Sequence, residues 1–321
     1  MEQGAHYAYP DNVVKRQKRP VEQGVAIKVI HKGKEVVKPL NKGGFDDISF
    51  RGEYPLSKIR YKSADIPLEI NLECFSPFIP GDLEKSANPC TILCYRIKNN
   101  SKAEVTASVA GWLENAVNPY DTDRRLGVRT ARLMASENRK TVYFASRSNG
   151  ATGVPRLEDQ HGYGSMSWSL FQPSSQSRHM LNAGDISDAR DIFSAVENSD
   201  EVASKESEMG SKEISILCDR IRLEAGEEKE VIFVLGWYFP HLNHQPDNRR
   251  DLMGITGIKD LKLHYANRFN SADEVAAHIC DHFEALAGAT RLWNQTYYDS
   301  SLPYWLLDRS FISINCMASH T

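Results

Sequence analysis

Two histidines four residues apart have the spacing most suggestive of metal chemistry. On a helix, His278 and His282 would share one face, and two imidazoles placed this way can bind a metal ion. The segment lacks the glutamate that follows the first histidine in zinc-protease helices, and no third ligand stands nearby. Because zinc sites use three or four protein ligands, we predict that the pair faces solvent and binds no metal. His241 and His244, in a loop after Pro240, are equally weak candidates.

Trp112 and Glu114 are the candidate substrate or interface residues. On the expected strand 103–114, Trp112 falls on the side of the polar residues, next to Glu114. Aromatic faces stack on ligands and are enriched at interfaces, so this pair could meet a sugar or a neighbouring domain. The alternative is that twist or a bulge in the strand buries Trp112. Trp168 and Trp237 share the parity of apolar neighbours, and we predict that both lie in the core.

The familiar catalytic and phosphate-binding motifs are missing. The sequence has no Gly-x-Ser-x-Gly, no Walker pattern and no Gly-x-Gly-x-x-Gly after a strand. Two acidic pairs are expected in loops, Asp121 with Asp123 and Glu158 with Asp159, but their spacing alone does not make them catalytic. The short glycine segment 162–164 beside His161 does not indicate a reaction either. We therefore assign no catalytic residue and expect no cofactor.

Cysteine usage indicates buried thiols rather than a disulfide scaffold. The chain has 6 cysteines in 321 residues, and Cys90 and Cys94 are the closest pair. On an extended strand these two share a face but lie about 13 Å apart, which excludes a common metal or a disulfide. We predict that they are buried and reduced.

Composition excludes several classes of protein. Hydrophobic residues make up 41% and charged residues 25%, which allows a sizeable core, and the net charge of −3 argues against a nucleic-acid binder. No run approaches the roughly 18 apolar residues of a membrane span. The N-terminus lacks the basic-then-apolar pattern of a secretion signal, which favours the cytoplasm, although an N-terminally truncated chain would also have lost its signal.

Alternating apolar and polar residues predict a large antiparallel two-sheet β-sandwich. Residues 68–74 and 93–97 alternate in this way, and later strands are expected at 141–145, 164–170, 214–223 and 231–239. Turn residues at 99–102 and 224–227 predict two hairpins. The acidic stretch 185–213, with a possible short helix near 186–196, is either a solvated surface excursion or a lid or partner contact.

At Asn270 the pattern changes from strand to helix. Ser271 and Glu274 have the spacing of a capping box, and helical periodicity continues to about Trp293. A second apolar stripe consists of Tyr304, Leu307, Phe311 and Ile314. With Pro303 at its start, it predicts an uncapped helix over 303–319. This stripe needs a partner surface, so we expect a helical domain beyond residue 321. The expected organisation is a loosely ordered segment 1–24, the sandwich 25–268, and the first helices of an incomplete domain at 269–321.

Several segments resemble the N-terminal region of glycoside hydrolase family 116, which contains bacterial β-glucosidases and non-lysosomal glucosylceramidase. The most specific is Phe-Ser-Pro-Phe-Ile-Pro at 75–80; the others are 50–55, 72–74, 111–115, 236–240 and the expected entry into the catalytic domain at 300–305. The resemblance implies a β-sandwich followed by an (α/α)₆ barrel, and retaining catalysis by two carboxylates. Both carboxylates belong to the barrel, so no catalytic residue transfers onto this chain. The glycine-rich stretch near the family's start is also missing.

These observations favour a supporting sandwich whose partners are the missing catalytic domain and, in the full-length enzyme, a carbohydrate or glycoside substrate. A self-standing carbohydrate-binding or interaction module is the alternative, and a small complete enzyme with an unrecognised site is a third possibility. An uncapped amphipathic helix at the C-terminus argues for the first, because a self-standing module has no use for it.

Overall fold

Alternating side chains fold into two antiparallel sheets, as expected for a mainly β protein. The structure, a computed structural model, describes residues 21–119, 121–160, 162–184, 186, 188–240 and 263–310. The small sheet has the order β11 (Arg178–Met180), β13 (Ile214–Leu223), β7 (Val105–Glu114), β1 (Gln23–His31) and β2 (Lys34–Pro39). The large sheet has the order β12 (Ser204–Glu208), β8 (Gly127–Ala135), β9 (Arg139–Ser148), β10 (Ser165–Phe171), β14 (Glu228–Tyr238), β6 (Cys90–Asn99), β5 (Leu68–Phe75), β4 (Leu56–Lys62) and β3 (Asp47–Glu53).

The main core lies between the two sheets. Trp168 stacks on Phe233 with ring centroids 4.9 Å apart, and its Nε1 donates to the carbonyl oxygen of Gly111 across the sheets at 3.1 Å. On β5 the apolar residues of one parity, such as Ile70, join this core, while the acidic residues between them take the other parity. The predicted core position of Trp168 is therefore confirmed, and Trp237 is partly buried against the same cluster.

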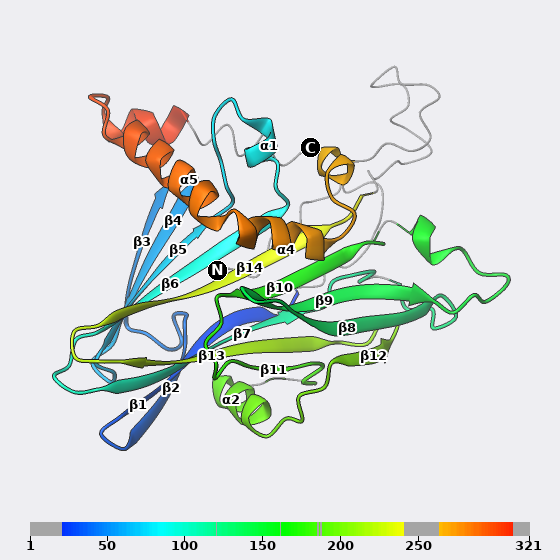
Figure 1. The fold of residues 1–321 in the computed structure, drawn as a ribbon, viewed down its shortest axis with the longest axis horizontal. Coiled ribbons are helices and arrows are strands. Elements are labelled where there is room, and N and C mark those ends of the chain that lie inside the picture. The colour runs from blue at the N-terminus through cyan, green and yellow to red at the C-terminus, as the bar shows by residue number, and fades with distance from the viewer. Residues whose placement is uncertain are drawn as a thin grey trace.

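Helices cover the outer face of each sheet and create two further cores (Figure 1). The helices α4 (Ala272–Asp281) and α5 (Phe283–Tyr298) pack on the large sheet. Cys90 and Cys94 point into this second core as free buried thiols, as predicted. The helix α2 (Ala189–Glu197) packs on the small sheet. Shorter helical turns are α1 (Leu83–Ser86), η1 (Leu157–Asp159) and η2 (His264–Asn267).

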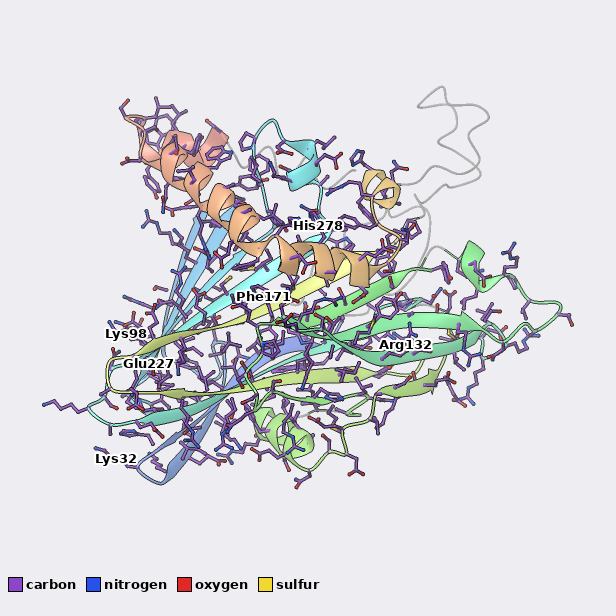
Figure 2. All side chains as sticks on the ribbon, in the orientation of Figure 1. Lys32, Lys98, Arg132, Phe171, Glu227 and His278 are labelled. Atoms are coloured by element: carbon purple, nitrogen blue, oxygen red, sulfur yellow. The ribbon has the colours of Figure 1, made fainter. Side chains whose placement is uncertain are left out.

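The two predicted hairpins are wrong. β6 and β7, and likewise β13 and β14, lie in different sheets, so the turns at 99–102 and 224–227 cross between the layers. Asn99 joins the two crossings: its side-chain Nδ2 donates to the carbonyl oxygens of Ala103, Leu223 and Glu224 at 2.8–3.0 Å. Lys98 and Glu227, which flank this point, lie at the left end of the molecule in Figure 2. Turn residues reverse a chain equally well within a sheet or between sheets, so their composition did not distinguish the two.

At α2 the acidic stretch 185–213 differs from the solvated excursion that its composition suggests, whereas residues 197–208 are mostly exposed. Its helix α2 is capped by Asp188, and its apolar residues at helical spacing are buried on the small sheet: Ala189, Ile192, Phe193 and Val196. Lys28 of β1 pairs with Glu197 at the end of the same helix. Within α2, the acidic residues Asp191 and Glu197 therefore lie on the exposed face of an amphipathic helix.

The long helix expected from Ser271 is confirmed but broken in two. The Ser271 hydroxyl accepts from the backbone N–H of Glu274, although the Glu274 carboxylate bonds to the N–H of Asn270 rather than to that of Ser271. His282 leaves helical geometry, with φ −114° and ψ 15°, and its Nδ1 lies 2.9 Å from the carbonyl oxygen of His278. His282 is therefore both the C-cap of α4 and the residue before α5.

Helical structure resumes after Pro303, over residues 304–310. Tyr304 is exposed as expected, but Leu307 is only 1% exposed, which differs from the expectation that both lack a partner surface. Phe311 and Ile314 lie outside the described residues, as do residues 1–20 of the segment 1–24, whereas Gln23 already begins β1. In the described part of the chain, no helix has the length and apolar character needed to cross a membrane.

Asn99→Ala is expected to lower the free energy of unfolding by about 2–3 kcal/mol. The substitution leaves carbonyl groups at both crossings without their donor, in a fully buried place. Urea denaturation followed by tryptophan fluorescence measures the change. Asn100→Ala is the matched control, because Asn100 is exposed, and it should shift stability by less than about 0.5 kcal/mol. Equal effects of the two substitutions would contradict the role given to Asn99.

Candidate functional site

One end of the sandwich collects the segments that the sequence singled out. The register joins Glu53 to Leu56 across the β3–β4 turn, Phe75 to Ile92, and Cys90 to Gly236, so these points follow one edge of the large sheet. In the small sheet, Glu114 at the end of β7 pairs with Ile214 at the start of β13, and Gln23 at the start of β1 pairs with Leu113. We call this the motif end. Segments far apart in the sequence therefore lie along one end of each sheet.

The β3–β4 turn holds α5 through main-chain contacts. Asn294, buried on α5, donates its Nδ2 to the carbonyl oxygens of Glu53 at 2.8 Å and Tyr54 at 3.3 Å. The backbone N–H of Phe78 donates to the Thr290 hydroxyl on the same helix at 3.1 Å. Two separate segments of the large sheet thus bond to one helix, four residues apart along its buried face.

An aromatic row runs from this contact along α5. Its rings are linked by centroid distances between 4.6 and 6.2 Å, and its members are Tyr54, Phe78, Trp293, Tyr297, Tyr298 and Tyr304. Edge and tilted contacts of this kind add stability beyond the apolar area that they bury. Burial, followed by the nearby Asp308 carboxylate, raises the pKa of Tyr298 to about 12, so its hydroxyl keeps its proton. That hydroxyl donates to Asp308 Oδ1 at 3.2 Å, and the Tyr297 hydroxyl donates to the carbonyl oxygen of Leu307 at 3.0 Å.

Several large hydrophobic side chains on the same elements face solvent. Trp305, which follows Tyr304 directly, has 67% of its surface exposed. The others belong to β3, to α5 and to the segment after it: Phe50, Leu292 and Leu302. These side chains leave apolar surface exposed on β3, on α5 and on the segment after it.

Trp112 is buried, and the pairing of β7 with both neighbouring strands passes through it without a bulge. Its ring is 9% exposed and lies beneath α2, on the face of the small sheet that points away from the main core. A side chain at Gly24 on the neighbouring strand would lie 2.2 Å from the ring, so only glycine leaves room for it. Glu114 is also buried, and its Oε2 accepts from the backbone N–H of Glu22 at 3.0 Å. Contact of either residue with a substrate or a partner remains a prediction.

A buried polar cluster beside Glu114 was not visible in the sequence. Glu213 is fully buried, and its Oε2 accepts from Asn115 Nδ2 at 3.0 Å and from the Ser207 hydroxyl at 2.9 Å. Burial raises the pKa of Glu213, while these two bonds and Arg129 oppose the shift. Arg129, also fully buried, donates to the carbonyl oxygen of Ser211. These residues come from four segments, so no spacing pattern could have found them.

The other candidates separate into local structural roles. Asp123 accepts from Arg125, whose hydrogen bonds lower the pKa of that carboxyl to about 2, and Asp121 accepts from Asn118. Glu158 lies 3.7 Å from Arg156, whereas His161, His241 and His244 lie outside the described residues. Within the described ranges, no group of three or more histidine, cysteine, aspartate and glutamate side chains is arranged to hold a metal ion.

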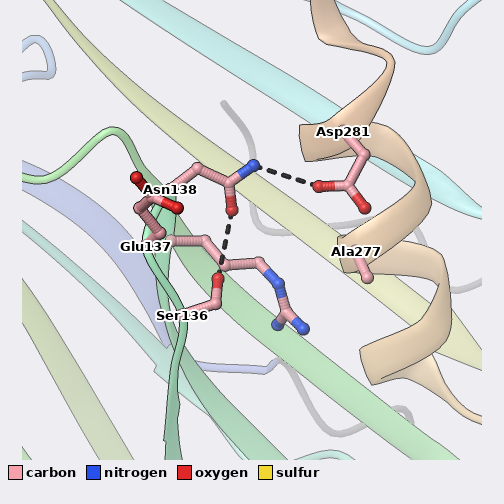
Figure 3. Close-up of a pocket in the computed structure, with 6 residues that line it drawn as sticks. Ser136, Glu137, Asn138, Ala277 and Asp281 are labelled. Carbon is pink, nitrogen blue, oxygen red and sulfur yellow. Dashed lines mark hydrogen bonds between the residues drawn. The ribbon is translucent and has the colours of Figure 1, made fainter.

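A shallow pocket of about 310 Å³ lies between the β8–β9 turn and α4 (Figure 3). Asn138 donates to Asp281 Oδ1 at 3.0 Å across it, and the Ser136 hydroxyl donates to Asn138 Oδ1 at 3.1 Å. Arg139 pairs with Asp273 at 2.5 Å, with both side chains largely buried. These bonds tie α4 to the sheet, so the polar groups of the pocket already serve a structural role.

Most of the chain matches one known protein family. A family model described as "beta-glucosidase 2, glycosyl-hydrolase family 116 N-term" matches residues 12–286. A search of curated proteins finds no match.

Solved structures show only distant similarity. A polysaccharide lyase is 13% identical with a TM-score of 0.36, and the alignment covers 72% of this chain and 27% of that one. A putative kojibiose phosphorylase from the human microbiome is 13% identical with a TM-score of 0.32, at 80% and 27% coverage. A GH36 alpha-galactosidase from Geobacillus stearothermophilus is 8% identical with a TM-score of 0.30, at 69% and 30% coverage. The chain spans less than a third of the length of each of these three proteins.

The histidine pair is expected to hold no stoichiometric zinc. The rings of His278 and His282 lie 4.6 Å apart on α4 and its C-cap, but two ligands are fewer than a zinc site uses. Elemental analysis of the purified chain measures the metal content. A value of about one zinc per chain, lost in His278→Ala, would contradict this prediction.

The same pair predicts a pH dependence of stability. Burial, and then the neighbouring His282 and Arg268, lower the pKa of His278 below 6.5. The folded state therefore binds fewer protons than the unfolded state, so stability falls as the pH drops below about 6.5. Urea denaturation at pH values of about 7.5 and 5 should show a smaller loss in His278→Gln than in the parent chain. His264→Gln, at an exposed histidine of η2, is the control and should leave the loss unchanged.

Proposed function

We propose that this chain, which belongs to the family of glycosyl-hydrolase family 116 N-terminal domains, is the supporting β-sandwich of a retaining β-glycosidase. The catalytic domain would be a separate helical part of the same polypeptide, and the substrate a carbohydrate or glycoside. The boundary expected at residues 268 and 269 remains a prediction.

The family match over residues 12–286 carries the proposal. It runs through both sheets and α4 and ends inside α5, so the matched region includes the elements that form the motif end. The candidate residues discussed above lie buried or serve structural roles. Trp112 is buried under α2, Asp123 accepts a hydrogen bond from Arg125, and Asp281 accepts one from Asn138. These placements support a domain that positions catalytic groups supplied elsewhere.

The helices provide the physical means for such support. α4 and α5 bury one side against the large sheet, where the contacts of Asn294 and the Arg291–Glu73 ion pair hold α5 in place. Their other side, and the segment that follows, carry Leu292 and Trp305 into solvent. Each such side chain forgoes roughly 1.5–3 kcal/mol of burial, which a neighbouring domain could recover. A sandwich with rigidly attached helices is thereby a platform for a helical catalytic domain.

The chain by itself is expected to hydrolyse no aryl-β-glucoside, since the family resemblance places both carboxylates outside it. Release of the aryl group from a chromogenic glucoside measures activity. Hydrolysis that copurifies with the chain and disappears in Glu114→Gln or Glu213→Gln would refute the supporting role.

The supporting role is tested directly by binding a family 116 catalytic domain in trans. The parent chain should bind it, and Trp305→Ser combined with Leu302→Ser should weaken binding by about tenfold or more, because both exposed side chains lose their apolar contact. Tyr143→Ser is the control, at a partly exposed aromatic residue of β9. Binding of β-linked oligosaccharides by the chain, with no affinity for the catalytic domain, would favour the self-standing carbohydrate-binding module instead.

A further inference from the structure

Glu53 is an unusual residue to find at the tip of an edge hairpin. Its side chain is only 4% exposed, although it ends β3, the outermost strand of the large sheet. A carboxylate removed from water in this way needs charged or hydrogen-bonding partners, because an unpaired buried charge is strongly destabilising. The partners therefore reveal what the residue does.

Three side chains converge on the Glu53 carboxylate. Arg51 from the same strand contacts Oε1, and Lys58 from β4 lies 3.4 Å from Oε2. The third partner is the hydroxyl of Tyr304, which comes from 251 residues later in the chain and donates to Oε1. Arg51 also reaches the Tyr304 hydroxyl and lies over its ring, 5.6 Å from the centroid. The turn thus binds a residue of the segment that follows α5.

That segment, residues 299–310, is held on its other side by α5 itself. The hydroxyls of Tyr297 and Tyr298 bond to the carbonyl oxygen of Leu307 and to Asp308. Asn294 of α5 bonds to the main chain of Glu53 and Tyr54. The β3–β4 turn, α5 and this segment therefore form a closed set of contacts in which each binds the other two.

We propose that Glu53 is a positioning residue: with Arg51 and Tyr304 it locks the connector, residues 299–310, onto the β3–β4 turn and so fixes the direction in which the chain leaves the sandwich. The proposal rests on the proposed function, since the connector would lead into the catalytic domain. It adds to that function a specific device, made of an exposed arginine, a buried carboxylate and a phenol, that orients one domain on the other.

The lock also explains how Trp305 is presented. Tyr304 is drawn toward Glu53, while the next side chain on the same helical turn remains in solvent. Adjacent helical residues point in directions about 100° apart, so fixing Tyr304 also fixes the direction in which the Trp305 side chain leaves the backbone. A partner domain would then meet a Trp305 whose backbone position is already fixed, which lowers the entropy cost of docking.

Hydrogen exchange of the connector amides in the 321-residue chain tests the proposal. Glu53→Gln keeps the shape but removes the charge, and Tyr304→Phe removes the hydroxyl. Each should accelerate exchange over residues 300–310 by about tenfold or more, and the double variant should add little, because the two changes break the same contact. Tyr304 is partly exposed, so its variant should fold even if Glu53→Gln does not.

Glu73→Gln is the matched control. Glu73 is also a largely buried carboxylate of the large sheet, and it pairs with Arg291 of α5 at 2.6 Å without touching the connector. Its substitution loosens α5 without breaking a contact of the connector, so it should accelerate connector exchange by much less than Tyr304→Phe does. Unchanged exchange in Tyr304→Phe, or an equal acceleration in Glu73→Gln, would overturn the proposal. The readout involves neither activity nor a catalytic domain, so failure of the proposed function would leave this result intact.

Discussion

Burial of the large sheet on both faces is the constraint on which the rest of the structure depends. Along β6 and β14, residues of one parity face the small sheet and residues of the other parity face α4 and α5. Removing either cover would expose a row of large apolar side chains, at roughly 1.5–3 kcal/mol each. The helices are therefore bound to the sandwich by the same hydrophobic effect that holds its two sheets together, and paired charges such as Arg139–Asp273 fix their register.

Because α5 is held in this way, the chain after it has a defined place. Asn294 attaches the helix to the β3–β4 turn, and the aromatic row continues the contact as far as Tyr304. A strand edge is normally a weak point of a sheet, since its backbone groups lack a partner. Here the edge hairpin is instead an attachment point for the helical segment. The segment 50–55, which carries part of the family resemblance, includes Glu53, whose carbonyl oxygen accepts from Asn294.

Much of the fold followed from local patterns. The alternation at 68–74 identified β5 and its inward face, and the capping residues Ser271 and Glu274 located the start of α4. The predicted hairpins failed, however, since turn residues at 99–102 and 224–227 do not specify which sheet receives the next strand. The expected solvated excursion at 185–213 was wrong for α2, because average charge conceals an apolar stripe: Ile192, Phe193 and Val196 lie on one side of the helix.

The sequence by itself determined the class of fold, the change from strand to helix at residue 270, and the family resemblance, because these depend on neighbouring residues and on short motifs. Only the tertiary structure decided that Asn99 joins both crossings, that α2 covers Trp112, and that Glu53 meets Tyr304. Each of these contacts joins residues that are far apart in the sequence or on different layers. Nothing in local spacing encodes such a contact, because it depends on how whole sheets and helices pack.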